Sequence, residues 1–545
     1  MHDEACTHHD DMMNNMLVGH EWLAREFGDY ARPKIGWHID PFGHSNGNPR
    51  LFAEMGFDAW FFARIDYEDK DVRMADKTMQ WVWKPFDASL GDNTSIFTHT
   101  MPDHYHGPES TRYDENNFNQ DPMVIDKNLS TFNADEKCDE LRKYLLDSSE
   151  HFATNRLMIP WGDDFWYSNA NLTFRNLENY IKYCNEKYDD ITLLYSTPSE
   201  YINALKEQKI EWPVRYDDMF PYADQNEDYW TGYFTSRADA KKQDRQTQAN
   251  FHASSKIYAQ KLIQQGVKEE TVKTIRHNKH AMLNALGIMQ HHDAITGTAK
   301  QAVADRYAQI LDEAVTQNNG LYSNLIGEKA AAAGLSSHLD WSACTVTSTT
   351  PMDCGLTSSI GQTWMVTAQN PSTVDSNLFG FKAPADGAYK TSVLKDGAWV
   401  SAPSDLICFE STQDTKEAES YTTCDLFIKS EVKAQNLAYF KIESVGSDAN
   451  GATLKTQATK ETTIENENIR LEFQKPGTTE AFFGVSDLVN DIKSNIKFAL
   501  QYYNPSVGTD MYADSDNVAS GAYIFKPKRG DMDKKSYSDF FKQET

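Results

Sequence analysis

Two apolar runs near the start of the chain, KIGWHID at residues 34–40 and FDAWFFARID at residues 57–66, decide the fold class. Each run is short and rich in aromatic or branched side chains, which is typical of a strand buried on both faces. NRLMIPWGDD at residues 155–164 and ITLLYS at residues 191–196 repeat the pattern, and helical stretches such as LENYIKYCNEK at residues 177–187 lie between the runs. This alternation predicts an α/β layer or barrel with parallel strands.

Three of these runs end in charged residues, namely Asp40, Arg64 and the Asp163–Asp164 pair. Open sheets and barrels of parallel strands keep their chemistry just beyond the C-terminal strand ends. Two adjacent acids repel each other, so one of them is expected to retain its proton near neutrality, as a general acid must. From the residues alone, Asp40 could equally cap the next helix, and the acidic pair could equally form a solvated turn.

Three helices are predicted between about residues 235 and 330, with Ser236 as the first N-cap and Asn319–Gly320 as the last terminator. The polar stretch HHDAITGT at residues 291–298 separates the second helix from the third. A lone histidine is usually structural, but two histidines and an aspartate at a helix junction match metal-ligand chemistry. His8–Asp11 and His104–His106 are weaker candidates, for which an exposed polar surface is the simpler interpretation.

Beyond about residue 340, Thr, Ser, Val and Gly replace the helix formers. KTSVLKDGAWVSA at 390–402, AYFKIESV at 438–445 and IRLEF at 469–473 alternate as half-buried strands do. The expected fold is therefore a multidomain α/β, α and β chain. An incomplete α/β barrel-like catalytic domain spans residues 1–210, a three-helix domain with the His-His-Asp motif spans 211–335, and a β-sandwich-like domain spans 340–545.

Composition excludes several classes of partner and site. The 545 residues carry a formal net charge of −27, which repels nucleic acid and anionic membranes. No apolar run approaches the roughly 20 residues that a membrane helix needs. The 7 cysteines include no CxxC pair, which argues against a thiolate zinc site or a redox motif. Three N-glycosylation sequons, at Asn93, Asn128 and Asn171, are compatible with secretion.

Six motifs resemble signatures of the glycoside hydrolase family 38 α-mannosidases. They are WHIDPFGHS (37–45), FFARIDYEDK (61–70), GDDF (162–165), QHHDAITGTAKQ (290–301), IENENIR (464–470) and ASGAYIFKP (519–527), in the family's order. NANLTFRNLENYI (169–181) and ASGAYIFKP are most similar to the lysosomal branch. The resemblance implies zinc-assisted, retaining hydrolysis of terminal α-D-mannose residues from oligosaccharides, in a lysosome or another acidic secretory compartment. A homodimer is a further expectation.

The resemblance also implies a role for each matching residue. Asp40 would be the nucleophile and a zinc ligand, Asp164 the general acid/base, and His292 a second ligand of one zinc ion. The residues implied in substrate binding are Asp293 at the sugar hydroxyls, Arg64 beside the nucleophile, and Phe42 and Tyr105 in the mannose subsite.

The chain departs from the family pattern at its start. The family's His-x-Asp strand end, which supplies two further zinc ligands, is absent, and MHDEA at residues 1–5 resembles a stretch downstream of it. We therefore expect the chain to begin after the first strand and to end within the β domain, so that residues 1–545 alone are weakly active or inactive. The lysosomal branch also implies a Cys344–Cys354 disulfide, with Cys408–Cys424 as a second pair.

Two other functions remain open at this stage. A zinc-dependent deacetylase-like hydrolase would need a compact Asp/His triad on the barrel itself. A non-catalytic glycan-binding remnant would bind mannosides without turning them over, in keeping with the missing motif.

Overall fold

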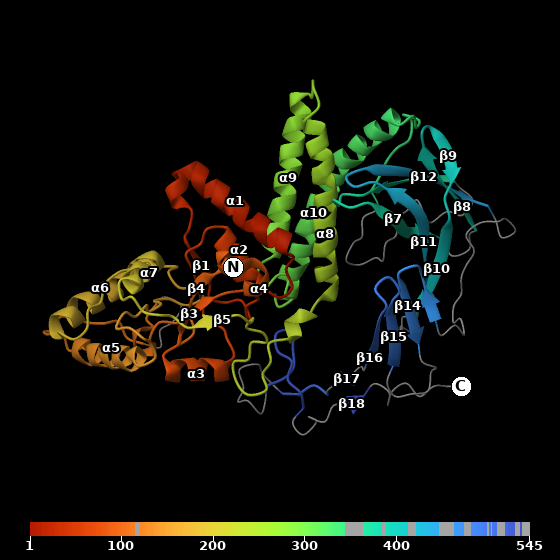
Figure 1. Cartoon of the computed structure of the whole chain (residues 1–545). Coiled ribbons are helices and arrows are strands. Elements are labelled where there is room, and N and C mark those ends of the chain that lie inside the picture. The colour runs from red at the N-terminus through yellow and green to blue at the C-terminus, as the bar shows by residue number, and fades with distance from the viewer. Residues whose placement is uncertain are drawn as a thin grey trace. The chain divides into compact units, whose positions relative to one another are not determined.

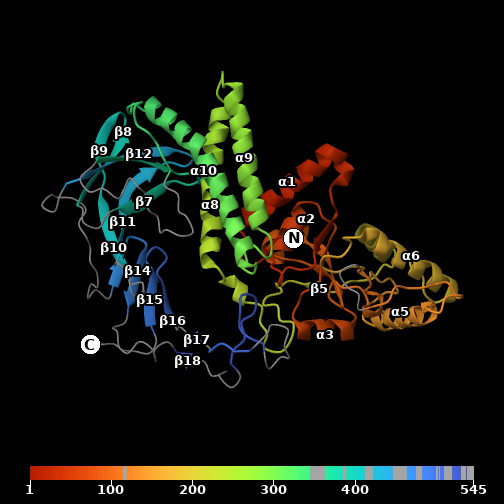
Figure 2. The same cartoon turned by 180° about the vertical axis from the view of Figure 1, so that it is seen from behind.

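The computed structural model describes residues 1–536 except 115–119, 344–362, 384–387, 412–420, 446–462, 474–480, 499–500, 503, 509–517 and 529–534. The chain forms two compact units (Figures 1 and 2). The first unit comprises residues 1–237, 289–299 and 507–526, and the second comprises residues 238–288, 300–506 and 527–545. The Cys344–Cys354 prediction lies outside the described residues.

The first unit alternates helices with a small sheet. Its α-helices are α1 His9–Phe27, α2 Gly47–Glu54, α3 Tyr67–Asp76, α4 Asp87–Leu90, α5 Ala134–Ser149, α6 Ala170–Lys187 and α7 Pro198–Lys206. Its strands are β1 Ile35–His38, β2 Ala59–Phe62, β3 Gln80–Trp83, β4 Ile96–Thr100 and β5 Val214–Arg215. Short 3-10 turns lie at η1 Asp29–Ala31, η2 Gly91–Thr94, η3 Glu109–Thr111 and η4 Gly232–Phe234.

The five strands follow the order β1-β2-β4-β3-β5. Strand β2 pairs in parallel with β1 and β4, while β3 runs antiparallel to β4. Every side chain of β2 is buried, as expected for a strand covered on both faces. Gly36 lets β1 approach α2, because a Cβ there would lie 2.5 Å from the ring of Phe52. The α/β alternation is thus confirmed at residues 34–66, in a mixed sheet.

Two predicted strands are wrong. Residues 155–164 and 191–196 form no strand in the structure. Their apolar side chains pack instead against the buried faces of α5 and α6, where Leu157, Ile159 and Leu193 are partly buried. An apolar run predicts burial, but it does not say whether the burial comes from a sheet or from a helix pair.

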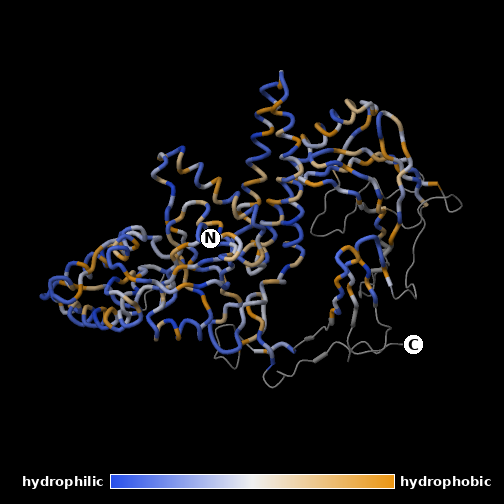
Figure 3. The backbone as a smooth tube through the Cα atoms, viewed as in Figure 1, coloured by the Kyte–Doolittle hydropathy of each residue, from blue (hydrophilic) through white to orange (hydrophobic). Residues whose placement is uncertain are grey.

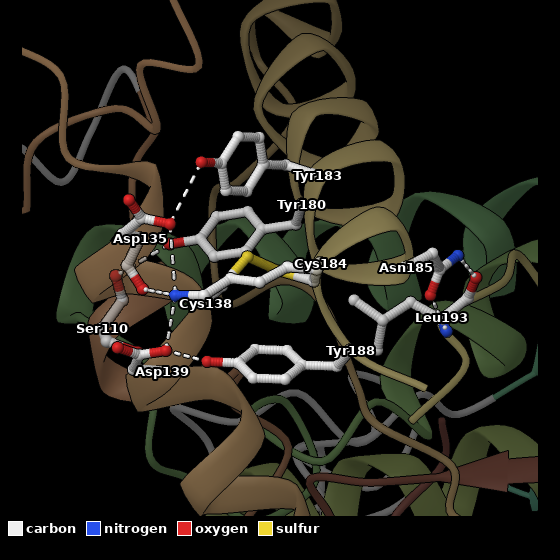
Figure 4. The surroundings of a disulfide bond; sticks show 11 residues. Ser110, Asp135, Cys138, Asp139, Tyr180, Tyr183, Cys184, Asn185, Tyr188 and Leu193 are labelled. Atoms are coloured by element: carbon white, nitrogen blue, oxygen red, sulfur yellow. Dashed lines mark hydrogen bonds and ion pairs between the residues drawn. A yellow bond between two sulfur atoms is a disulfide. The ribbon is translucent and has the colours of Figure 1, made fainter. Parts of the chain in front are cut away.

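A disulfide joins α5 to α6, which lie side by side (Figures 1 and 2). The sulfur atoms belong to Cys138 and Cys184, and both residues are fully buried. Around them, Lys187 Nζ pairs with Asp135 and Asp139 on the facing helix (Figure 4). The sequence analysis did not predict this bridge, since buried cysteines spaced 46 residues apart carry no local signal.

Three helices open the second unit: α8 Ala238–Leu262, α9 Glu269–Met289 and α10 Gln301–Ala332. They alternate between hydrophilic and hydrophobic residues along their length (Figure 3). The predicted stop at Asn319–Gly320 is wrong, because α10 continues through both residues. Asn318 is fully buried there, donating to Asn250 and accepting from Tyr258, so polar side chains bridge the helices without ending one.

The remaining strands form antiparallel sheets, which confirms strands at 390–402, 438–445 and 469–473. Their bounds are β6 Thr363–Gln369, β7 Ser376–Ala383, β8 Tyr389–Lys395, β9 Ala398–Ser401, β10 Ser404–Ser411, β11 Tyr421–Val432, β12 Leu437–Ser444, β13 Thr463–Glu465, β14 Ile469–Phe473, β15 Ala481–Asp487, β16 Ile492–Phe498, β17 Gln501–Tyr502 and β18 Lys535–Ser536. The sheets β10-β11-β7 and β6-β12-β8-β9 share one apolar core. Cys424, opposite Cys408 in the β10–β11 register, is disulfide-bonded. In the described part of the chain, the helices lack the length and apolar character needed to cross a membrane.

Candidate active site

Strands β1 and β2 bring Asp40 and Arg64 together. The two strands pair in parallel with His38 opposite Phe62, and each charged residue follows two positions later. Both side chains therefore leave the sheet at the same edge. Arg64 donates from Nε to Asp40 Oδ1 at 2.9 Å and from Nη2 to the same oxygen at 2.5 Å. The predicted contact between these residues is present.

Asp40 is held as a carboxylate from both sides. Its second oxygen, Oδ2, lies 2.8 Å from Nε2 of His292. Burial alone would raise the pKa of Asp40, but the hydrogen bond from His292 and the charge of Arg64 hold the pKa well below its usual range. The arrangement keeps a buried carboxylate ionised and fixes the direction of both of its oxygens.

Four aromatic rings surround the guanidinium of Arg64 and shield much of the pair from solvent. The ring centroids lie 5.0–5.9 Å from its Cζ and belong to Trp230, Phe42, Tyr222 and Tyr105. Stacking of this kind suits the planar, always charged Arg side chain. Arg64 is consequently 13% exposed and Asp40 is 18% exposed.

Asp164 reaches the same site from a turn. The hydroxyl of Tyr105, whose ring lies over Arg64, donates to Asp164 Oδ2 at 3.4 Å. Burial raises the pKa of Asp164, and the negative charges of Asp40 and Asp163 raise it further. The two carboxyl groups are thus shifted in opposite directions, Asp40 toward the ionised form and Asp164 toward the protonated form.

His292 and Asp293 lie in the turn that follows α9. Gly297 closes this turn with a φ of +79°, and a Cβ there would lie 2.5 Å from the carbonyl oxygen of Ser236. Asp293 Oδ1 accepts from Thr298 Oγ1 at 2.8 Å. Burial would raise the pKa of Asp293, but hydrogen bonds from His291 and Thr298 lower it. Asp293 is accordingly an ionised acceptor that follows His292, the partner of Asp40, in the chain.

The turn after α9 and the facing Asp40 offer donor types that fit a zinc ion, with His292 and Asp40 as the ligands expected from the sequence. His291, His292 and Asp293 each offer a ligand atom, and these atoms lie within 4.8 Å of one another. His292 Nδ1 donates to the carbonyl of Met1 at 2.9 Å, so Nε2, which here donates to Asp40, is the nitrogen that would bind zinc after losing its proton. Imidazole nitrogen and carboxylate oxygen are ligand types that zinc accepts. A similar group, His8, His9 and Asp10, lies at the start of α1.

The structure adds residues to the site that the sequence analysis did not assign. Tyr523, from the motif ASGAYIFKP, has its hydroxyl 3.5 Å from Asp293 Oδ1. Its ring lies 5.5 Å from that of Phe42, which is 2% exposed beneath His292. Trp230 packs against both rings. The motif around Tyr523 was a usable signal, whereas nothing local in the sequence marks Trp230.

Comparisons with known proteins agree with this geometry. Residues 1–225 match the N-terminal domain of glycosyl hydrolases family 38, and residues 228–328 match the alpha mannosidase middle domain. The chain is 30% identical to lysosomal alpha-mannosidase from Dictyostelium discoideum over 557 residues, covering 97% of this chain and 52% of that protein. It is also 30% identical to the Homo sapiens lysosomal alpha-mannosidase over 537 residues, with coverages of 97% and 50%.

The chain therefore spans about half the length of the curated relatives it matches. The crystal structure of an alpha-mannosidase from Enterococcus faecalis V583 shares the fold, with a TM-score of 0.58 and 14% identity, covering 98% of this chain and 55% of that one. With two adjacent family domains matched and the sequence similarity extending beyond them, the chain belongs to glycosyl hydrolase family 38.

Proposed function

We propose that this chain carries the catalytic centre of a retaining α-mannosidase, which removes terminal α-D-mannose residues from oligosaccharides. The observation that supports this most strongly is the meeting of two carboxyl groups around Arg64 and Tyr105: Asp40 pairs with Arg64, and Asp164 accepts from Tyr105, whose ring contacts Arg64. Their surroundings lower the pKa of Asp40 and raise that of Asp164. Glycosidases need one ionised carboxylate and one protonated carboxylic acid at the scissile bond. Environments that separate two pKa values in this way assign the two roles.

In the first step, Asp40 attacks the anomeric carbon of the mannose as its bond to the leaving oxygen breaks. Arg64 keeps Asp40 ionised and occupies Oδ1. Asp164 delivers its proton to the leaving oxygen, and the hydroxyl of Tyr105 orients Asp164 for this transfer. The product of the step is an ester between Asp40 and the sugar.

In the second step, Asp164 has become a carboxylate and removes a proton from water. The water attacks the anomeric carbon from the face that the leaving group left, and the bond to Asp40 breaks. Two inversions at one carbon give net retention. Asp164 regains its proton in this step, so the site returns to its starting state.

We assign substrate binding to groups beside the nucleophile. Asp293, an ionised acceptor, suits sugar hydroxyl donors, and Tyr523 lies within reach of the same carboxylate. Phe42 and Tyr105 are buried in the structure and shape this edge of the site by packing around Arg64. Asp40 and His292 would hold one zinc ion, which when bound orients neighbouring hydroxyl groups of the sugar and stabilises developing charge.

We also propose a lysosomal or secretory location, because the relatives named above are lysosomal enzymes. The buried Cys138–Cys184 disulfide supports an oxidising compartment. The homodimer and the domain limits of 1–210, 211–335 and 340–545 remain predictions.

The test is hydrolysis of an aryl α-D-mannoside at acidic pH, with NMR identification of the first anomer released. Because two of the family's zinc ligands are absent from this chain, the expected result is weak release of α-mannose. Asp40→Asn and Asp164→Asn should both abolish it, while Asp58→Asn at an exposed position keeps it. Release of β-mannose would rule out the retaining mechanism. Saturable binding of mannose without hydrolysis would favour the glycan-binding alternative.

A further inference from the structure

The chain starts with MHDE at residues 1–4, in which the three polar side chains are buried and the mechanism above does not use them. We call residues 1–4 the anchor segment. It lies beside α2 and β1 (Figure 1), and His2, Asp3 and Glu4 are 1%, 0% and 6% exposed. Burying three polar side chains in sequence is costly unless each one is hydrogen-bonded. Their partners therefore indicate what the segment does.

Glu4 holds both ends of the loop that carries Asp40. Its Oε1 accepts from Nδ1 of His38 and from Nδ1 of His44, each at 2.9 Å. Its Oε2 accepts from the backbone N–H of Ser45 at 3.0 Å. His38 ends β1 before Asp40, and His44 and Ser45 follow it, so a single carboxylate clamps the loop on both sides.

The rest of the anchor segment holds the turn that carries His292. The carbonyl of Met1 accepts from His292 Nδ1 at 2.9 Å. His2 forms a backbone bridge with His291, and the N–H of Asp3 donates to the carbonyl of Gln290 at 2.9 Å. Four consecutive residues thus contact two loops that are about 250 positions apart in the chain, and whose side chains meet at the Asp40–His292 contact.

We propose that Glu4 is a positioning residue, which through the anchor segment fixes the Asp40 loop relative to the His292 turn. The inference rests on the proposed function, because it concerns the placement of the proposed nucleophile. A displacement of about 1 Å at a reacting group can cost roughly 100-fold in rate. Glu4 touches neither the substrate nor the reacting atoms and acts only through the loop.

Burial raises the pKa of Glu4 well above its usual range, and the N–H donors that converge on its oxygens act in the opposite direction. Two accepting oxygens suit this task better than an amide. Three N–H donors, two from histidines and one from the backbone, converge on the two oxygens of Glu4. Glutamine has the same shape but only one accepting oxygen, and its NH2 group would face a donor. Glu4→Gln therefore removes part of the clamp without opening a cavity.

The first readout is hydrogen–deuterium exchange of the full chain, which does not depend on activity. In Glu4→Gln, exchange is expected to rise at least ten-fold in peptides covering residues 36–48 and also in those covering 289–296. Asp244→Asn, which removes a fully buried carboxylate in the second unit, serves as the matched control and leaves both regions unchanged. Faster exchange in 36–48 alone, or no change in either region, would overturn the proposal.

Should Glu4→Gln fail to fold, a second pair of variants decides the question. His44→Asn retains an N–H donor near the position of Nδ1, whereas His44→Leu has a similar size and no donor. Faster exchange in both regions for the Leu variant than for the Asn variant is expected, and equal exchange in the two would contradict the clamp.

The second readout separates this proposal from the proposed function. In Glu4→Gln, kcat for an aryl α-mannoside is expected to fall at least ten-fold with KM changed by less than three-fold. A fall in kcat that merely follows the loss of folded protein, measured by the melting curve, would count against positioning. If the wild-type chain does not hydrolyse mannosides, the proposed function fails, and the exchange experiment still decides the role of Glu4.

Discussion

The disulfide between α5 and α6 gives a prediction whose magnitude follows from the chain itself. Cys138 and Cys184 are 46 residues apart, and both are fully buried. On the chain-entropy model, closing a loop of this length lowers the entropy of the unfolded segment by about 13 cal/mol/K, or about 4 kcal/mol at 25 °C. The ion pairs of Lys187 around the bridge have exposed carboxylates, at Asp135 and Asp139, and contribute little by comparison.

The perturbation is the double change Cys138→Ala and Cys184→Ala, since alanine leaves no polar atom in the buried site. A loss of about 4 kcal/mol corresponds to roughly a thousand-fold faster exchange of the slowest amides. Native-state hydrogen exchange of peptides from α5 and α6 measures this locally, so the second unit acts as an internal reference.

Reduction provides the control for the cavities that alanine leaves. Dithiothreitol is expected to speed exchange in α5 and α6 of the wild-type chain almost as much as the double substitution does. In the double variant it should cause no further change in these two helices, whereas the disulfide at Cys424 in the second unit remains reducible. A change of less than ten-fold in both helices would refute the loop-entropy reasoning and would mean that packing alone holds the pair together.

Four further outcomes are expected. Arg64→Met leaves the Asp40 carboxylate without its buried partner, at a cost of about 3 kcal/mol. We expect kcat/KM to fall roughly 100-fold and the acid limb of the pH–rate profile to move to higher pH. Arg73→Met, which removes an arginine stacked on Trp81, is the control and should leave both quantities unchanged. Mannosidase activity falls as the pH rises through the raised pKa of Asp164, because only the protonated form donates, and a rate that climbs above neutrality would contradict this assignment. Burial lowers the pKa of His99 to about 3 from 6.5, so the unfolded chain binds a proton at this residue that the folded chain does not. The free energy of unfolding is therefore unaffected by His99 above pH 6.5 and falls by about 1.4 kcal/mol per pH unit below it. In denaturation of the first unit followed by tryptophan fluorescence, His99→Gln should lose less stability on acidification than the wild-type chain. Expressed in a eukaryotic secretory host, the chain should carry amidase-sensitive N-glycans at its exposed sequons, Asn93, Asn128 and Asn171. Unmodified asparagine at all three positions in mass spectrometry would contradict the proposed compartment.

Part of the site follows from local rules of sheet geometry. Asp40 and Arg64 end two apolar runs, and parallel pairing of β1 and β2 makes their contact a direct consequence. The approach of His292 to Asp40 is different, because 252 residues separate them and spacing gives no information about it. That contact was expected only from the family resemblance.

Other features could not be predicted because their causes are nonlocal. The runs at 155–164 and 191–196 are apolar enough for strands, but α5 and α6 provide the surface that buries them. Asn319 was predicted as part of a helix stop, but Asn250 on α8 donates to its side chain and the helix continues. In the sequence, nothing distinguishes Glu4 from the other acidic residues of a chain with net charge −27. Only the fold shows the three N–H groups that donate hydrogen bonds to its carboxylate.

The central claim is that Asp40 is the nucleophile of a retaining mannosidase, and covalent trapping tests it most directly. A fluorinated mannosyl fluoride, which forms the sugar ester readily and releases it slowly, is incubated with the full chain and zinc at acidic pH, and the labelled peptide is identified by mass spectrometry. The account predicts one sugar on the peptide that contains Asp40, and no label in Asp40→Asn. A label on another residue, or none on the wild-type chain, would contradict it.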